Sequence, residues 1–248
     1  MRIEMGTWVA IEARAAAAAR AREGLAAAFA AVTEVVALMS PERSGSDLER
    51  LNRARCGVAV PVHEHTWRVL AFAQRLNRLS EGIFDPCLPE KPGTVQDLEL
   101  TWKQAPAVTC QVPLRLDLGG VAKGFAVDRA VKALRAAGCE AGLVNAGGDV
   151  RVFGTQAQTI LLRGPCGALQ AHALSNGAVA VSDQDASRPP PGHRGYYART
   201  GSRVPARRYS AVRAPDAMTA DALTKCVLLC PESLSEALLN ELDSEELG

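Results

Sequence analysis

The segment from Asp117 to Asp128, DLGGVAKGFAVD, has the residue types and spacing of an anion-binding turn. Two glycines let the backbone turn tightly after a predicted strand, and a helix is predicted to follow them. The free N–H groups and the dipole of a helix start favour an anion, and Lys123 adds a positive charge. Asp117 can accept hydrogen bonds from hydroxyl or amide groups of a ligand. Because such turns are common, a purely structural role also explains this segment.

A second group of polar residues, Asp221, Thr224 and Lys225, shares one face of a predicted helix because its members are three and four positions apart. A carboxylate and a hydroxyl beside a phosphate are hard oxygen ligands of the kind that Mg²⁺ accepts. The alternative is a solvated helix face that carries an Asp–Lys pair.

The composition of the 248 residues narrows the classes of partner. A net charge of +1 and an aromatic content of 4% disfavour nucleic acid and acidic membrane surfaces. Seven cysteines, without a Cys-x-x-Cys pair or a nearby histidine cluster, argue against a zinc site and against a secreted disulfide framework. No signal peptide is recognisable, and charges in the alanine-rich run exclude a spanning helix. We therefore expect a cytoplasmic protein with free thiols and no membrane partner.

The elements that must position these residues follow from hydrophobic periodicity. Three- and four-residue spacing predicts helices, and two capping-box spacings place helix starts at Ser46 and Ser233. Alternation predicts short strands, two of them joined in a hairpin at Gly147-Gly148. The predicted helices cover 15–39, 63–80, 121–137 and 219–229, with two short ones after 46 and 233, and the predicted strands cover 7–11, 114–118, 143–145, 150–153, 160–163, 169–174, 178–182 and 209–213. Residues 87–112 are interpreted as loops with one strand, and residues 183–206 as a mobile surface loop.

The order of these elements predicts the fold class. Helices do not join the strands as regular crossovers, which disfavours a doubly wound parallel sheet. We predict an α+β fold, with mixed, mostly antiparallel sheets and helices packed on one face, in one domain over residues 1–248.

Six short motifs follow one another along the chain: Met5-Gly6-Thr7, SDLERLN at 46–52, GIFDP at 82–86, the segment 117–128, NAGGD at 145–149 and ADAL at 220–223. Taken together in this order, they resemble the FAD:protein FMN transferases. The resemblance spans nearly the whole chain and implies two sheet-and-helix halves, roughly 1–113 and 114–248, with a nucleotide site between them. The implied reaction moves FMN from FAD onto a threonine of a target flavoprotein and releases AMP, while Mg²⁺ withdraws charge from the phosphoryl oxygens.

The same resemblance implies roles for individual residues. The catalytic candidates are His193 and Asp221. The carbonyl of Gly120, with Asp221 and Thr224, would hold Mg²⁺. The residues expected to contact FAD are Met5, Ile83, Phe84, Asp85, Asp117 and Lys123.

Two departures from the family pattern leave the function open. The family's His-x-x-Asp-Pro-x-Thr-Gly stretch corresponds to residues 194–201, where Arg-Thr-Gly remains and the His and Asp do not; His193 is displaced by one residue. Lys225 replaces a metal-binding threonine, and its ammonium would repel a divalent cation or supply its charge. The sequence thus allows an FMN transferase, a non-catalytic FAD-binding relative such as a carrier or a partner-binding module, or a plain α+β scaffold.

Overall fold

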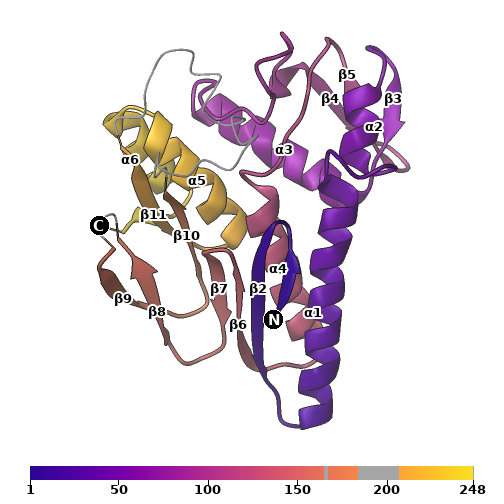
Figure 1. Cartoon of the computed structure of the whole chain (residues 1–248). Coiled ribbons are helices and arrows are strands. Elements are labelled where there is room, and N and C mark those ends of the chain that lie inside the picture. The colour runs from indigo at the N-terminus through magenta and orange to yellow at the C-terminus, as the bar shows by residue number, and fades with distance from the viewer. Residues whose placement is uncertain (165–166, 184–206, 248) are drawn as a thin grey trace.

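A seven-stranded sheet forms the centre of the computed structural model, which describes residues 1–164, 167–183 and 207–247 (Figure 1). Every neighbouring pair of strands in it is antiparallel. The predicted hairpin at Gly147-Gly148 is confirmed, and it joins two central strands. In spatial order the strands are β1 (Arg2–Glu4), β2 (Thr7–Arg14), β6 (Ala141–Ala146), β7 (Asp149–Phe153), β10 (Ala178–Asp183), β11 (Tyr209–Ala214) and β12 (Glu245–Glu246).

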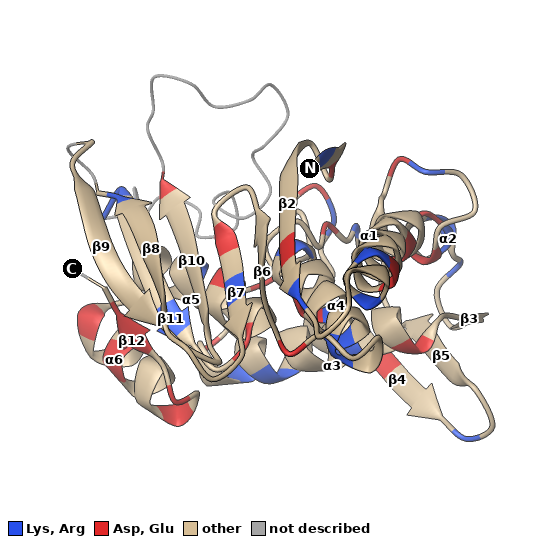
Figure 2. Cartoon of the chain, turned by 90° about the horizontal axis from the view of Figure 1, so that it is seen from below, with Lys and Arg blue, Asp and Glu red and all other residues tan. Residues whose placement is uncertain are grey.

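Three helices cover one face of this sheet: α1 (Ala18–Met39), α4 (Ala122–Ala136) and α5 (Ala217–Leu229) (Figures 1 and 2). Strand alternation decides which side chains they meet. On β10, Ala178 and Ala180 belong to the main core, and Val179 between them belongs to a separate cluster. The predicted α+β class, with mostly antiparallel strands and helices on one face, is confirmed.

The separate cluster forms where a hairpin of β8 (Gln158–Arg163) and β9 (Leu169–Leu174) packs against the large sheet. Ile160, Leu162 and Leu174 of the hairpin meet Val152 of β7 and Val179 of β10. Because this hairpin covers part of the second face, β7 and β10 carry apolar residues on both sides.

The remaining elements surround α3 (Glu64–Leu79), which begins beside the C-terminal part of α1 (Figure 1). They are α2 (Asp47–Arg53), the antiparallel sheet β3 (Ala59–Pro61), β5 (Pro106–Cys110) and β4 (Leu98–Trp102), and the short helix η1 (Val95–Asp97), whereas α6 (Glu232–Glu241) packs on α5 and β12. Strands β1 and β2 join a sheet whose other strands all lie beyond residue 140. The large sheet therefore contains strands from both predicted halves, and the division near residue 113 stays a prediction. Among the helices of the described residues, none has both the length and the apolar character needed to cross a bilayer.

Three predictions about local structure are wrong. Residues 114–118 do not form a strand. The side chain of Asn52 accepts the backbone N–H of Leu116 at 2.7 Å and donates to its carbonyl at 3.0 Å, so these groups do not pair with a neighbouring strand. Leu116 forms an isolated bridge to Cys87. The segment 87–112 contains two paired strands instead of one, plus a helical turn. The last helix begins after Pro231, without a side-chain cap from Ser233. The loop predicted at 183–206 lies outside the described residues from 184 onward.

Candidate functional site

The predicted turn before α4 is present, and an aspartate side chain shapes it. Oδ1 of Asp117 accepts the backbone N–H of Gly119 at 2.8 Å, which closes the turn. The backbone N–H of Asp117 donates to the carbonyl of Pro86 at 2.8 Å, so the turn is tied to the 82–86 segment. Helix α4 then begins at Ala122 and places Lys123 in its first turn.

A cavity of about 540 Å³ opens beside this turn, a size within the usual range for small-molecule sites. Asp117 and Lys123 line one side, and Met5, in the turn between β1 and β2, lines another. Met5 has a φ of 54°, a left-handed conformation that is uncommon outside glycine and concentrates at functional sites. The structure therefore brings together three of the residues predicted to contact FAD. The full lining comprises Met5, Gly6, Thr7, Val35, Val36, Met39, Ser40, Pro41, Asp117, Gly119, Ala122, Lys123 and Gly147.

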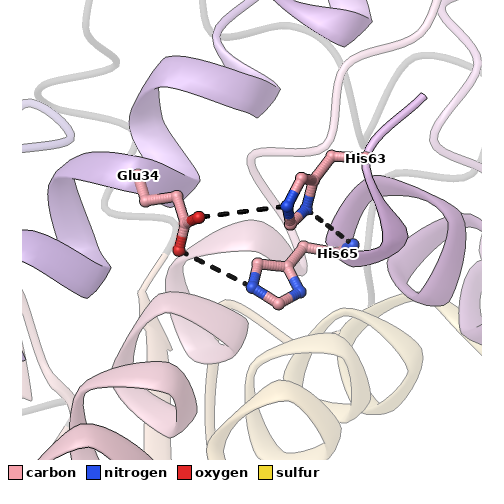
Figure 3. Close-up of side chains that lie close together, drawn as sticks. All are labelled: Glu34, His63 and His65. Atoms are coloured by element: carbon pink, nitrogen blue, oxygen red, sulfur yellow. Dashed lines mark hydrogen bonds and ion pairs between the residues drawn. The ribbon is translucent and has the colours of Figure 1, made fainter.

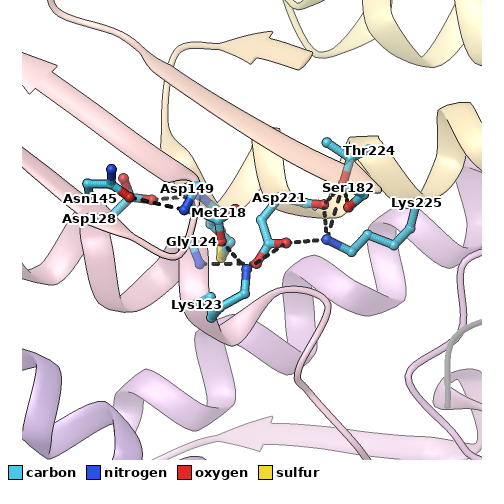
Figure 4. A network of polar contacts seen from close by, with 11 residues as sticks. Lys123, Gly124, Asp128, Asn145, Asp149, Ser182, Met218, Asp221, Thr224 and Lys225 are labelled. Carbon is cyan, nitrogen blue, oxygen red and sulfur yellow. Dashed lines mark hydrogen bonds and ion pairs between the residues drawn. The ribbon is translucent and has the colours of Figure 1, made fainter. Parts of the chain in front are cut away.

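Behind the cavity lies a buried network around Asp221 of α5 (Figure 4). Asp221 is 0% exposed, and its Oδ2 accepts the backbone N–H of Gly124 at 3.1 Å. A carboxylate is favourable there because the first turn of α4 carries a partial positive charge. This contact requires α5 to approach α4 closely, and Gly124 permits it because a Cβ at that position would overlap the carbonyl of Ala217. Part of the anion position predicted at the helix start is thus filled by the protein itself.

Two lysines compensate the buried carboxylates. Lys123 is ion-paired with Asp149 of β7, and its Nζ lies 3.7 Å from Oδ1 of Asp221. Lys225 is ion-paired with Oδ1 of Asp221 from the other side. Two ammonium groups therefore balance two carboxylates within one buried cluster.

The charges in this cluster shift each other's protonation. Burial alone would lower the pKa of Lys123, but the carboxylates of Asp221 and Asp149 raise it above its ordinary value. Burial alone would raise the pKa of Asp221, but Lys123 and Lys225 hold it below its ordinary value. Burial and the neighbouring charge of Asp221 raise the pKa of Asp149. Asp221 is consequently the firmly ionised member and a poor proton acceptor.

The donor set predicted for Mg²⁺ does not fit a divalent ion as these side chains are arranged. Both oxygens of Asp221 are engaged, one by Gly124 and one by Lys225. The hydroxyl of Thr224 donates to the carbonyl of Asp221 at 2.7 Å and lies 3.1 Å from Nζ of Lys225. Gly120 is buried in the turn before α4. An ammonium already occupies the neighbourhood of the oxygen ligands, and an added cation would meet repulsion from it.

The segment Ile83-Phe84-Asp85 does not line the cavity. Phe84 is buried, and Oδ1 of Asp85 accepts the backbone N–H groups of Cys87 at 2.9 Å and Val95 at 3.2 Å. These contacts fix the turn that supports Asp117 through Pro86. Contact of these three residues with FAD stays a prediction, and the predicted catalytic residue His193 lies outside the described residues.

Sequence reasoning assigned no role to two further aspartates, the buried Asp149 and the half-buried Asp128. Asp149 follows the Gly147-Gly148 turn and is the ion-pair partner of Lys123. Asp128 accepts the backbone N–H groups of Ala217 and Met218, each at 2.9 Å, and so caps the first turn of α5. Both belong to the quoted motifs, as the last residues of NAGGD and DLGGVAKGFAVD. Their position at the ends of these motifs is the signal that could have identified them.

Comparison with known proteins identifies similar sequences. A model of the ApbE family matches residues 5–113 and 89–247 of this chain. The FAD:protein FMN transferase of Haemophilus influenzae is 27% identical in an alignment of 154 residues that covers 50% of this chain and 44% of that protein. The matched region therefore spans less than half the length of that curated relative.

Solved structures share the fold. The apo form of the Pseudomonas stutzeri flavinyl transferase ApbE superposes with a TM-score of 0.81 at 21% identity, covering 99% of this chain and 88% of that one. The flavin transferase ApbE from Vibrio cholerae gives 0.80 at 22% identity, covering 99% and 91%. At these identities the likeness establishes the three-dimensional arrangement alone.

Proposed function

The chain belongs to the ApbE family, and we propose that it is an FAD:protein FMN transferase that moves FMN onto a threonine of a target flavoprotein. The observation that carries the proposal is the cavity at which Met5, Asp117 and Lys123 meet. It offers an apolar wall from α1, a carboxylate that can accept hydrogen bonds, and an ammonium that can attract a pyrophosphate. FAD presents groups that match each of these features.

The proposed reaction makes one phosphorus–oxygen bond and breaks another. The threonine hydroxyl oxygen attacks the phosphorus atom of the FMN moiety, the bond to the AMP moiety breaks, and the hydroxyl proton is lost. Negative charge grows on the phosphoryl oxygens, and fixed positive groups stabilise it. Lys123 faces the cavity and supplies one such charge. Because its pKa is raised by Asp149 and Asp221, it stays protonated throughout the neutral range.

Asp221 has a positioning role in this proposal. Its oxygens hold Gly124 and Lys225, and its charge fixes Lys123 at the cavity wall. Asp221 is not itself among the residues that line the cavity, so it acts through the two lysines. His193 is kept as the candidate that receives the hydroxyl proton.

The ion pair between Lys225 and Asp221 favours a second candidate function, a non-catalytic FAD-binding protein. In the family's implied mechanism a divalent ion supplies two positive charges near the pyrophosphate. An ammonium supplies one, which compensates bound FAD but stabilises the charge of the transition state less. FAD binding would then persist while FMN transfer became slow.

One experiment separates the two candidates. The purified protein is incubated with FAD and a threonine-containing peptide or flavoprotein, with and without Mg²⁺. Chromatography then measures AMP release, and mass spectrometry measures attachment of FMN to threonine. The transferase proposal expects both products in equal amounts. FAD binding without either product would support the second candidate, and failure to bind FAD would refute both.

We also propose that the protein works in the cytoplasm. Its support is that the six cysteines of the described residues, Cys56, Cys87, Cys110, Cys139, Cys226 and Cys230, carry free thiols, as expected in a reducing compartment.

A further inference from the structure

Three side chains outside the cavity meet where α1 passes the start of α3. Glu34 lies on α1, His63 is the residue that precedes the first turn of α3, and His65 lies in that turn (Figure 3). One potential ligand atom from each of the three lies within 4.8 Å of the others. The sequence argument against a zinc site weighed the cysteines and the absence of a nearby histidine cluster. It did not anticipate that the fold brings a carboxylate from a distant helix to this His-x-His pair.

The nitrogen–oxygen distances in this cluster are closer to the spacing of ligand atoms around a small ion than to hydrogen-bond lengths. Nε2 of His63 lies 3.9 Å from one oxygen of Glu34, and Nε2 of His65 lies 3.6 Å from the other. Both separations are too long for hydrogen bonds. In a tetrahedral zinc site with bonds near 2.0 Å, neighbouring ligand atoms are about 3.3 Å apart. Small shifts of the exposed Glu34 and the half-exposed His63 toward the buried His65 would bring the three atoms to that spacing.

His65 is the buried member of the cluster. It is 3% exposed, and burial, followed by the charge of Arg129, lowers its pKa to about 4. Burial and the charge of Arg129 oppose a metal cation for the same reason, so a metal site here depends on the positions of the three ligand atoms. Nδ1 of His65 has no hydrogen-bond partner within the described residues and lies 3.6 Å from Oε1 of Glu64.

His63 has a competing structural role, because its Nδ1 accepts the backbone N–H of His65 at 3.2 Å and so caps α3. In the neutral ring this leaves the proton on Nε2, which faces Glu34. A metal ion at Nε2 would displace that proton, and Nδ1 would give up its capping hydrogen bond on becoming protonated. Without a metal, the cluster consists of a capping histidine and a buried histidine packed edge-on against Phe125, with ring centroids 5.6 Å apart.

We propose that Glu34, His63 and His65 bind one Zn²⁺ ion, with water completing the coordination. Two imidazoles and a carboxylate are a ligand set that zinc accepts. The charges of Glu34 and Glu64 favour the ion, and Arg129 opposes it. The proposed ion would connect α1 to the start of α3. Since Val35 and Val36, the next residues of α1, line the cavity, it would also stabilise one wall of the proposed flavin site.

The test uses the untagged protein and measures Zn²⁺ binding by titration calorimetry, with Co²⁺ absorption as a spectroscopic probe of coordination. Glu34→Gln removes the carboxylate, and His63→Ser removes an imidazole but keeps an oxygen acceptor at the helix cap. The matched controls are Glu23→Gln, at an exposed position of the same helix, and His172→Ser, at a described histidine on β9. We expect one Zn²⁺ per chain, at least tenfold weaker binding in each ligand variant, and unchanged binding in the controls.

A second readout does not depend on calorimetry. Zn²⁺ should raise the thermal unfolding temperature of the parent protein and of both controls, and raise it less in the ligand variants. If the parent binds no Zn²⁺ at micromolar concentrations, or if either ligand variant binds it like the parent, the proposal is wrong. FAD binding, measured in parallel without zinc, should be the same in His63→Ser and His172→Ser. A parent protein that binds FAD but no Zn²⁺ would contradict the metal site alone. A parent protein that binds Zn²⁺ but no FAD would contradict the proposed flavin site alone.

Discussion

Gly124 of α4 lies so close to Ala217 of α5 that a methyl group on Gly124 would overlap the backbone carbonyl of Ala217. This close approach brings Asp221 onto the N–H of Gly124 and fixes the buried ion pairs behind the cavity. One glycine thus determines both how two helices pack and where the charges of the site stand.

Gly124→Ala should consequently destabilise the fold. The added methyl group meets backbone atoms, which cannot rotate away, so α4 and α5 must separate. Overpacking of this kind costs about 1–3 kcal/mol. Denaturant unfolding followed by circular dichroism would measure the loss. Gly164→Ala is the control, because a methyl group on Gly164 would lie 3.6 Å from the carbonyl oxygen of Ala168, an ordinary van der Waals contact. Equal stability of the two variants would show that the helix contact is looser than described.

Asp117→Ala should weaken FAD binding. If Asp117 accepts a hydrogen bond from FAD, its removal costs about 1.5–3 kcal/mol, a factor of about 10 to 150 in affinity. Alanine also removes the turn-closing bond to Gly119, so Asp117→Asn serves as the second variant. Asparagine retains an acceptor for that N–H and lacks only the charge. Calorimetric titration with FAD that gave the parent affinity for both variants would remove Asp117 from the flavin site.

The sequence allowed the prediction of most elements that carry the site, because their signals are local. Hydrophobic periodicity predicted α1 and α4, and the glycine pair at 147–148 predicted the β6–β7 hairpin. The residues 114–118 were mispredicted as a strand for a non-local reason. Their alternation is real, but the amide group of Asn52, 64 positions away in sequence, takes the backbone bonds of Leu116.

The partners of the site residues were predictable only where they share a helix. The four-residue spacing of Asp221 and Lys225 predicts their ion pair. Asp149 meets Lys123, and Glu34 meets the histidines, only because separate elements pack together. The hydrophobic periodicity of a single helix or strand does not predict contacts between side chains of separate elements. Short motifs and spacing therefore identified candidate side chains but not the full sets that face one another.

The thiols should differ sharply in reactivity. Burial, reinforced by the charge of Cys56, raises the pKa of Cys110 to about 11, while Cys56 is exposed. At pH 8 only about a thousandth of Cys110 is thiolate, the reactive form, and the fraction rises as the pH approaches 11. Iodoacetamide at pH 8 should label Cys56 before Cys110, as peptide mass spectrometry would show. Urea should remove the difference, and rapid labelling of native Cys110 would contradict this assignment.

The ion pair between Lys225 and Asp221 leads to a prediction about the metal. With the ammonium beside the carboxylate, FAD affinity should be nearly independent of Mg²⁺. Lys225→Thr removes the ammonium and adds a hydroxyl, so Asp221, Thr224 and the new side chain become a set of hard oxygen ligands. FAD binding should then become Mg²⁺-dependent, and Mg²⁺-dependent release of AMP should appear or increase, by about tenfold or more if electrostatic stabilisation limits the reaction.

Lys225→Met separates the two effects of that substitution, because it removes the charge without adding an oxygen ligand. Asp221 keeps Lys123 at 3.7 Å in this variant, so its charge is not left uncompensated. If Lys225 replaces the ion, Lys225→Met should bind FAD more weakly than the parent and respond to Mg²⁺ less than Lys225→Thr. Brisk FMN transfer by the parent protein that strictly requires Mg²⁺ would instead show that Lys225 moves aside when FAD binds. The ion pair would then be a feature of the ligand-free state, and the metal would bind through Asp221 after all.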